Sequence, residues 1–283
     1  MNISTIAVIG SGTMGSGIAQ VFAQAGYRVV VHDVAQPALE RARRAIERSM
    51  GKFVEKKTLT ATDRDAALGR LVVTTTFDDL AAADFVVEAI SEDLEAKRSL
   101  FQRLDRHARP EVILASNTSS ISITLLGAAT SRPDKVLGMH FMNPVPLMTL
   151  VELIRGQATS ADAMQTATEL TKALGKVPVE AADYPGFIAN RLLMPMLNEA
   201  FFALMEGVGA REDIDTVMKL GMNHPMGPLT LADFIGLDVC LAILDVLHEG
   251  LGDPKYRACP LLRRMVAAGH LGRKTGRGVY EYE

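Results

Sequence analysis

Two ionisable side chains lie in a stretch of sequence that is otherwise almost entirely apolar. The stretch from Leu137 to Ile154 reads LGMHFMNPVPLMTLVELI and carries His140 in its first apolar run and Glu152 in its second. A buried carboxylate without a partner costs on the order of several kcal/mol of desolvation, so Glu152 either faces water or has a partner. If the two runs are neighbouring strands, the carboxylate can fix the imidazole tautomer and leave the other ring nitrogen for proton transfer. The alternative is a core histidine and a glutamate that faces water at a sheet edge.

Two further segments carry polar side chains that suit a substrate site. The run ASNTSS (115–120) begins at the end of a predicted strand, and ligands bind at the carboxyl ends of such strands in a parallel sheet. Thr118, Ser119 or Ser120 could instead cap the helix that follows. Asn190 lies in the first turns of an apolar helix, where a buried amide needs a partner.

A glycine-rich turn near the start of the chain has the spacing G-x-G-x-x-G. The run AVIGSGTMGSG places Gly10, Gly12 and Gly15 after a predicted strand and at the start of a predicted helix, with Thr13 and Met14 between them. The three glycines permit a tight turn, a close approach to a pyrophosphate and close packing of the helix on the strand. An ordinary glycine-rich turn is the alternative, and the strand and helix around the motif argue against it.

The second predicted strand ends in an acid that favours one dinucleotide over another. Asp33 is positioned to accept hydrogen bonds from an adenosine ribose. Its charge would repel a 2′-phosphate, and no arginine follows it until Arg41. The sequence therefore predicts NAD rather than NADP as the cofactor.

These residues need a scaffold, and the first 180 residues alternate short apolar runs with helical patterns. Runs of this kind are typical of strands buried on both faces, and the alternation predicts a Rossmann-like, doubly wound α/β sheet. The predicted strands are 5–10, 28–33, 70–75, 84–89, 111–116 and 135–141, extended by 149–154 and 177–182. The predicted helices are 15–25, 36–50, 60–69, 92–108 and 119–128.

The pattern changes near residues 184–186, beyond which helices dominate. We expect a first domain at 1–184 and an all-α C-terminal domain at 185–283, with helices at 187–205, 211–221, 228–248 and 260–268. The segment 187–205 is apolar nearly all the way round, which is typical of a helix buried inside a domain or in a subunit interface. This helix has more apolar surface than one small helical domain can cover, so we expect a homodimer through the C-terminal domain.

The overall composition argues against several classes of protein. The 283 residues carry a net charge of −3, which gives no basic excess for nucleic acid. Cys240 and Cys259 form neither a disulfide framework nor a metal-ligand spacing, so we expect a reducing cytoplasm and no metal. The start of the sequence lacks a signal-peptide pattern, and runs of about 18 apolar residues are absent, so we expect no membrane span.

Several runs resemble the L-3-hydroxyacyl-CoA dehydrogenases, with the bacterial 3-hydroxybutyryl-CoA dehydrogenases as the most similar branch. They are ASNTSS, HFMNPVPLMTLVELI, DYPGFIANRLLMPMLNEA, HPMGPLTLADFIGLD and GRKTGRGVYEY, and the resemblance covers essentially the whole chain. It implies an NAD-binding Rossmann-like domain with a helical arm at about 36–69, followed by a helical dimerisation domain. The implied reaction interconverts a (3S)-3-hydroxyacyl-CoA and the 3-oxoacyl-CoA by hydride transfer at C3.

The resemblance also implies roles for particular residues. His140 matches the general acid/base and Glu152 its acidic partner, while Ser119 and Asn190 match residues that hold the substrate's 3-oxygen. Further cofactor contacts are implied for Glu92, Lys97, Ser119, Asn143 and Lys274. Contacts with coenzyme A are implied for Ser49, Lys52 and Lys56 of the arm, for which a solvated basic helix face is the alternative.

The sequence therefore predicts a cytoplasmic, NAD-dependent oxidoreductase that acts on an acyl-CoA. One alternative is a two-domain β-hydroxyacid dehydrogenase with a catalytic lysine on the interdomain helix, but GFIANR offers Asn190 and no lysine. A second alternative is an inactive structural or ligand-binding relative of the same fold. The intact set of His140, Glu152, Ser119 and Asn190 argues against it. Fatty-acid, butyrate and aromatic-acid metabolism all fit the implied reaction, and short acyl chains are favoured.

Overall fold

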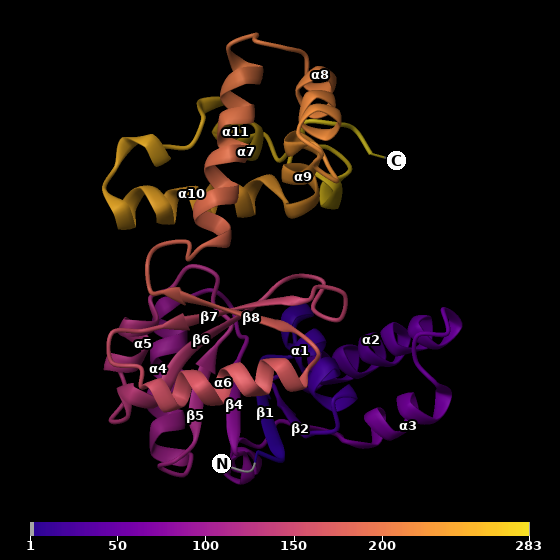
Figure 1. Ribbon diagram of the computed structural model, residues 1–283, viewed down its shortest axis with the longest axis vertical. Coiled ribbons are helices and arrows are strands. Elements are labelled where there is room, and N and C mark those ends of the chain that lie inside the picture. The colour runs from indigo at the N-terminus through magenta and orange to yellow at the C-terminus, as the bar shows by residue number, and fades with distance from the viewer. Residues whose placement is uncertain (1–2, 283) are drawn as a thin grey trace. The chain divides into compact units, whose positions relative to one another are not determined.

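The chain divides into two compact units in the computed structural model, which describes residues 3–282. The first unit is Met1–Asp183 and the second is Tyr184–Glu283. The first holds a sheet with helices packed on it, and the second is built from helices (Figure 1). The predicted fold class, a Rossmann-like doubly wound sheet followed by an all-α part, is confirmed.

The sheet of the first unit has eight strands among residues 3–282, in the order β3-β2-β1-β4-β5-β6-β7-β8. Its central strands are apolar and covered on both faces, as Ile6, Ala7 and Val8 illustrate with no exposed surface. Burial on both faces explains why these strands read as continuous apolar runs. The strands are β1 Thr5–Ile9, β2 Arg28–His32, β3 Leu71–Thr74, β4 Phe85–Glu88, β5 Ile113–Ser116, β6 Val136–Phe141, β7 Leu150–Arg155 and β8 Val177–Ala182.

One pair of strands departs from the parallel arrangement. Strands β6 and β7 are antiparallel, whereas the other paired strands within residues 3–282 run parallel. An antiparallel pair needs no crossover helix, so the loop MNPVPLM can join the two strands directly. The register sets His140 opposite Glu152.

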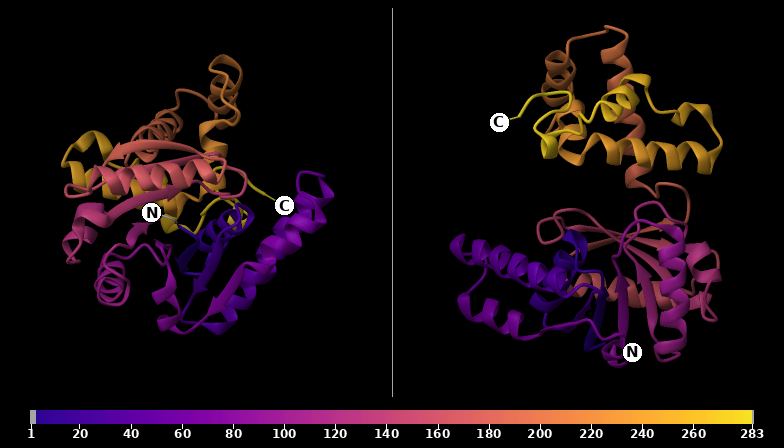
Figure 2. Two further views of the ribbon diagram at one scale, coloured as in Figure 1. Left: turned by 60° about the horizontal axis from the view of Figure 1, so that its bottom comes forward. Right: turned by 180° about the vertical axis from the view of Figure 1, so that it is seen from behind.

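The α-helices of this unit pack on the sheet, and all but the last of them lie where the sequence predicts a helix, with different first or last residues. They are α1 Thr13–Gln24, α2 Gln36–Glu55, α3 Ala61–Gly69, α4 Leu94–His107, α5 Ile123–Ala128 and α6 Ala161–Ala173. Figures 1 and 2 show α2 and α3 side by side, extending away from the sheet on the side of β2. Helix α2 is five residues longer than predicted, and Phe53 and Val54 in the added turn are partly buried.

Two sequence-based expectations for this unit were wrong. Helix α5 begins at Ile123 and not at 119, because Ser122 is its N-cap and the preceding segment makes other hydrogen bonds. Helix α6 was not predicted at all, although the parallel pair β7–β8 requires a crossover. Its buried face is built from alanine, threonine, one methionine and one leucine, which leaves a weak apolar period.

The second unit packs its helices around their own apolar core. Its elements are α7 Ala189–Met205, α8 Arg211–Thr216, a π-helical turn Val217–Gly221, α9 Pro228–Ile235, α10 Leu237–Leu251 and α11 Pro260–Ala267. The single helix expected at 228–248 is two helices, because Gly236 has a φ of +106° that a helix cannot contain. Along residues 3–282, the helices are too short or too polar to cross a bilayer.

Two buried aspartates form hydrogen bonds that hold residues 279–282 against this unit. Asp233 accepts hydrogen bonds from the backbone N–H groups of Val279 and Tyr280, both at 2.9 Å, and from the hydroxyl of Tyr282. Asp215 accepts from the hydroxyl of Tyr280 at 2.9 Å. Burial, reinforced by the carboxylate beside it, raises the pKa of each tyrosine above its usual value, so both hydroxyls stay protonated donors.

Candidate active site

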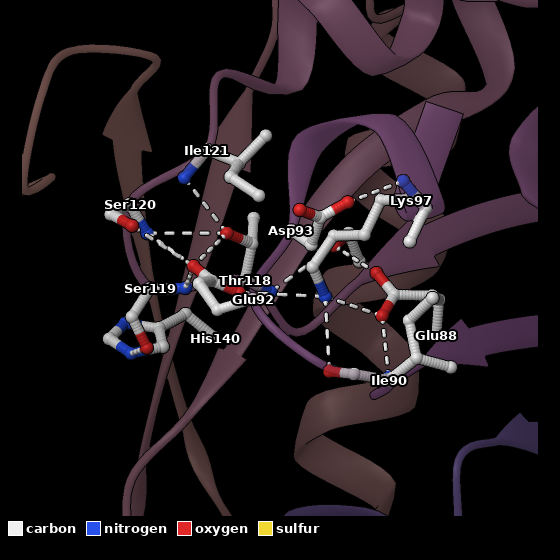
Figure 3. Close-up of polar contacts among 12 residues, drawn as sticks. Glu88, Ile90, Glu92, Asp93, Lys97, Thr118, Ser119, Ser120, Ile121 and His140 are labelled. Carbon is white, nitrogen blue, oxygen red and sulfur yellow. Dashed lines mark hydrogen bonds and ion pairs between the residues drawn. The ribbon is translucent and has the colours of Figure 1, made fainter. Parts of the chain in front are cut away.

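A histidine with a carboxylate on one nitrogen and a hydroxyl on the other forms the centre of the site. His140 Nδ1 is 2.8 Å from Glu152 Oε2, and both side chains are buried, with 6% and 1% of their surface exposed. Glu152 therefore does not face water, and the strand pairing answers why an acid lies in an apolar strand. On the other side of the ring, His140 Nε2 is 3.0 Å from Ser119 Oγ (Figure 3).

This arrangement fixes the protonation pattern of the ring. Because Nδ1–H donates to the Glu152 carboxylate, Nε2 holds a lone pair and accepts from the Ser119 hydroxyl. A substrate hydroxyl bound at Nε2 could give its proton there, and the carboxylate would stabilise the imidazolium that forms. The group is suited to proton transfer with an alcohol or a carbonyl oxygen.

Ser119 lies in a loop that one carboxylate organises. Glu92 Oε1 accepts from the backbone N–H groups of Ser119 and Ser120 at 2.9 and 3.1 Å, and from the hydroxyl of Thr118 at 2.5 Å (Figure 3). Burial opposes ionisation of Glu92, but the charge of Lys97 and these hydrogen bonds outweigh it and lower the pKa of the carboxyl. The loop is thus held by an ionised acid and does not serve as a helix cap.

One residue of β4 and one of α4 lie next to this loop. Lys97 is 1% exposed, and its Nζ is 2.5 Å from Glu88 Oε1 and 3.5 Å from Glu92 Oε2. The sequence reasoning assigned Lys97 to the cofactor and missed Glu88. The only sequence signal was weak, since Glu88 is an acid at the end of the apolar run DFVVEA, where a solvated acid gives the same pattern.

In the glycine-rich turn, the backbone of the glycines lies close to the backbone of other segments. Gly10 has a φ of +96°, and a Cβ there would lie 2.4 Å from the carbonyl oxygen of Ala89. A Cβ on Gly15 would lie 1.8 Å from the carbonyl oxygen of Gly10. Within residues 3–282, nothing lies within 4 Å of the Cβ position of Gly12, and no side chain caps α1. The helix N-terminus is therefore open to an anion such as a pyrophosphate.

Asp33 has a partner inside the turn. Its Oδ2 accepts from Ser11 N at 2.9 Å and Ser11 Oγ at 2.7 Å, and its Oδ1 accepts from Ala35 N at 3.1 Å. Burial would raise the pKa of Asp33, but these hydrogen bonds outweigh it and lower the pKa. Asp33 is therefore ionised near neutral pH and has lone pairs left for a ribose. These residues fit an adenine dinucleotide.

A cavity of about 630 Å³ runs from this turn along α2. Among the sequence-predicted residues, it brings together Gly12, Thr13, Asp33, Ser49 and Asn143. It does not include Lys52 on α2 or Lys56 just after that helix, which are both exposed. Nor does it include Glu92 and Lys97, which belong to the loop network. Met14, also predicted to contact the cofactor, packs against the hydrophobic core. On the side of α2, the cavity is lined by three arginines, Arg41, Arg44 and Arg48.

Two predicted residues belong to the second unit. Asn190 lies in the first turn of α7 and is 8% exposed. Lys274 follows α11, and its Nζ lies 2.6 and 2.7 Å from the two carboxylate oxygens of Asp238.

The sequence matches two models of one protein family. Residues 5–184 match the model described as 3-hydroxyacyl-CoA dehydrogenase, NAD binding domain, and residues 186–282 match 3-hydroxyacyl-CoA dehydrogenase, C-terminal domain. A probable 3-hydroxybutyryl-CoA dehydrogenase of Deinococcus radiodurans is 59% identical over 275 residues, which cover 97% of this chain and 99% of the relative. The human mitochondrial hydroxyacyl-coenzyme A dehydrogenase is 43% identical over 288 residues, covering 99% of this chain and 92% of the relative.

Solved structures agree with these matches. The crystal structure of an (S)-3-hydroxybutyryl-CoA dehydrogenase from Ralstonia eutropha superposes with a TM-score of 0.97 at 50% identity, and the match covers 100% of both chains. The proton-transfer group, the open glycine turn and these matches point the same way: the chain belongs to the 3-hydroxyacyl-CoA dehydrogenase family.

Proposed function

We propose that the protein is an NAD-dependent dehydrogenase that interconverts (3S)-3-hydroxyacyl-CoA and 3-oxoacyl-CoA, with 3-hydroxybutyryl-CoA and acetoacetyl-CoA as its pair. The observation that carries the proposal is the chain of contacts from Glu152 through His140 to Ser119, in a member of this family. The high identity to 3-hydroxybutyryl-CoA dehydrogenases supports the short acyl chain. An inactive relative would not need a buried histidine held between an acid and a hydroxyl.

The proposed mechanism assigns one task to each side chain. In the oxidation direction His140 Nε2 takes the proton of the 3-hydroxyl, and Glu152 stabilises the resulting imidazolium. Ser119 and Asn190 hold the 3-oxygen while C3 becomes a carbonyl carbon. When bound, NAD⁺ supplies the acceptor for the hydride that leaves C3 with its electron pair. In the reverse direction His140 returns the proton to the oxygen.

An absorbance assay tests this function. NADH should be consumed when acetoacetyl-CoA is added, and the rate should fall as the 3-oxoacyl chain becomes longer. The His140→Ala variant should still bind NADH and turn over far more slowly. If neither acetoacetyl-CoA nor longer 3-oxoacyl-CoA thioesters consume NADH, the proposal is wrong.

The arm formed by α2 and α3 is proposed to bind the nucleotide part of coenzyme A through Ser49, Lys52 and Lys56. Both lysines are exposed, and an exposed ion pair contributes about 1 kcal/mol or less, which is at most about fivefold in KM. Lys52→Ala and Lys56→Ala should raise KM for acetoacetyl-CoA but not for acetoacetyl-pantetheine, which lacks the nucleotide. Lys172→Ala, at an exposed position on α6, is the matched control. Equal effects on both thioesters would contradict the assignment.

The two units are proposed to divide the work. Residues 1–184 form the NAD-binding domain with its arm, and residues 185–283 form the helical domain through which two copies associate. Support for a dimer comes from large apolar side chains that the single chain leaves exposed in the second unit. They are Leu192 (69%), Val208 (76%), Val217 (58%), Leu220 (81%), Met222 (61%) and Phe234 (54%). A molar mass of one chain by light scattering at micromolar concentration would overturn the dimer.

The protein is proposed to act in the cytoplasm, in fatty-acid metabolism. Both cysteines, Cys240 and Cys259, are buried free thiols, which a reducing compartment preserves. Burial raises the pKa of Cys240 to about 12, so this thiol is unreactive at neutral pH.

A further inference from the structure

A buried ion pair lies beneath the loop that carries Ser119. Glu88, the last residue of β4, has no exposed surface, and Lys97 in α4 is 1% exposed. Their charged groups meet at 2.5 Å (Figure 3). Removing two charges from water costs on the order of several kcal/mol, and the attraction between the charges returns about the same amount. Two apolar side chains at these positions would therefore stabilise the fold at least as well as the ion pair. The pair therefore invites an explanation other than stability.

Every oxygen of the Glu88 carboxylate is committed to a fixed donor. Oε1 accepts from Lys97 Nζ and also from Ile90 N at 2.7 Å, and Oε2 accepts from Ser116 Oγ at 2.6 Å. These contacts reach three segments: the turn after β4, helix α4 and the end of β5. A side chain with this many fixed partners cannot move without moving the segments that it joins.

Two paths of hydrogen bonds lead from Glu88 to Ser119. In the first, Ser116 Oγ accepts from Thr118 N at 3.2 Å. In the second, Lys97 contacts Glu92, and Glu92 accepts from Ser119 N at 2.9 Å. The first path ends on the backbone of Thr118, the residue before Ser119, and the second ends on the backbone of Ser119 itself, whose hydroxyl lies 3.0 Å from His140 Nε2.

The charge of Glu88 also decides where Lys97 goes. Lys97 is 1.0 Å nearer to Glu88 than to Glu92, as the distances of 2.5 and 3.5 Å show. Without the Glu88 charge, the buried ammonium group would be drawn to Glu92, its other carboxylate within reach. Glu92 would then turn away from the backbone of Ser119 and Ser120.

We propose that Glu88 is a positioning residue for the reaction: through Lys97, Glu92 and Ser116 it holds the Ser119 hydroxyl against His140. The inference rests on the proposed function, because it concerns the same site. It gives Lys97 a role inside the protein, where it sets the orientation of Glu92.

The test is the Glu88→Gln variant, which keeps the shape of the side chain and removes its charge. Turnover of acetoacetyl-CoA should fall by roughly 10- to 100-fold, because a displacement of about 1 Å at a reacting group has this effect. The loss should be measured as kcat at saturating NADH, because residues of this network are also implied in cofactor contacts. The matched control is Asp105→Asn, which breaks the partly buried Asp105–Arg132 pair in the same unit and should lower stability without this loss of kcat.

A double variant separates positioning from a general structural effect. In a Ser119→Ala background the hydroxyl is gone, so Glu88→Gln should lower kcat by less than about threefold further. Losses that multiply in the double variant, or an unchanged kcat in Glu88→Gln alone, would overturn the inference. If Glu88→Gln does not fold, Ser116→Ala gives the same decision, since it cuts one path and leaves the ion pair intact. An unmodified protein without activity would instead refute the proposed function.

Discussion

At the scale of single residues, Glu152 matters because of the ring that it contacts. The Glu152→Gln substitution keeps the side-chain shape but removes the charge that stabilises the imidazolium, so kcat should fall strongly and cofactor affinity should not. His140→Ala should lower the rate by roughly 10²–10⁴-fold, with NAD still bound. The combined variant should lose far less than the product of the two losses, as measured by initial rates.

The control for this prediction is another glutamate of the same sheet. Glu180→Gln removes an acid from β8 that pairs with Arg155 at 2.6 Å and is about half exposed, so kcat should stay near normal. A Glu152→Gln variant that matches this control would make Glu152 a structural residue.

Asp33 should decide between NAD and NADP. The Asp33→Ala substitution removes a carboxylate that can bind a ribose hydroxyl and repel a 2′-phosphate. The ratio of kcat/KM for NADH to kcat/KM for NADPH should therefore decrease by about 10-fold or more. Because Asp33 also holds Ser11, the control is Ser11→Ala, which leaves the charge in place and should preserve the preference. Equal kcat/KM with both cofactors in the unmodified protein would contradict the assignment.

At the scale of elements, the junction between β1 and α1 depends on one close approach. A methyl group at Gly15 would lie 1.8 Å from the carbonyl oxygen of Gly10, which is backbone and cannot rotate away. Gly15→Ala should therefore shift the start of α1, weaken NADH binding and lower the free energy of unfolding by roughly 1–3 kcal/mol. Fluorescence titration with NADH and urea unfolding would measure these two effects.

Helix α2 supplies the comparison for that substitution. Gly51 lies inside this helix, and within residues 3–282 its Cβ position has no neighbour closer than 4 Å. Gly51→Ala should raise the free energy of unfolding by up to about 1 kcal/mol, because alanine favours the helix. If Gly15→Ala and Gly51→Ala change the free energy of unfolding equally, the close contact at Gly15 is unimportant.

At the scale of the whole molecule, Asp84 ties the first strand into the centre of the sheet. It accepts from Ser4 N and Thr5 N, both at 2.9 Å, and from Arg109 at 2.7 Å. Burial would raise the pKa of Asp84, but these contacts outweigh it and lower the pKa from 3.8 to about 2. A lowered pKa means that the folded state favours the carboxylate, so its contribution is complete above pH 4 and is lost as the pH falls towards 2.

The Asp84→Asn substitution should thus lower the free energy of unfolding by about 2 kcal/mol at pH 7. The difference from the unmodified protein should shrink as the pH falls from about 4 towards 2, as followed by circular dichroism in urea. Asp65→Asn, which changes an exposed acid on α3, should alter stability by less than about 0.5 kcal/mol at any of these pH values. A constant deficit across the pH range would show that the carboxylate charge is not the cause.

The sequence by itself determined the features that short stretches of chain encode. The glycine turn, the acid Asp33 and the buried strands follow from backbone geometry and from apolar runs, which act within a few residues. The chemistry expected of His140 and Glu152 could be reasoned from their types, and the family from motifs spread along the chain.

Only the tertiary structure decided which distant residues meet. The antiparallel register of β6 and β7 turned two candidates into a contact, and the segment before Ile123 left helical geometry because Glu92 competes for its N–H groups. Glu88 was overlooked because its partners Lys97 and Ser116 lie 9 and 28 residues away, and a strand-end acid looks alike whether solvated or buried. Burial and pairing depend on contacts across the whole fold, which no local pattern records.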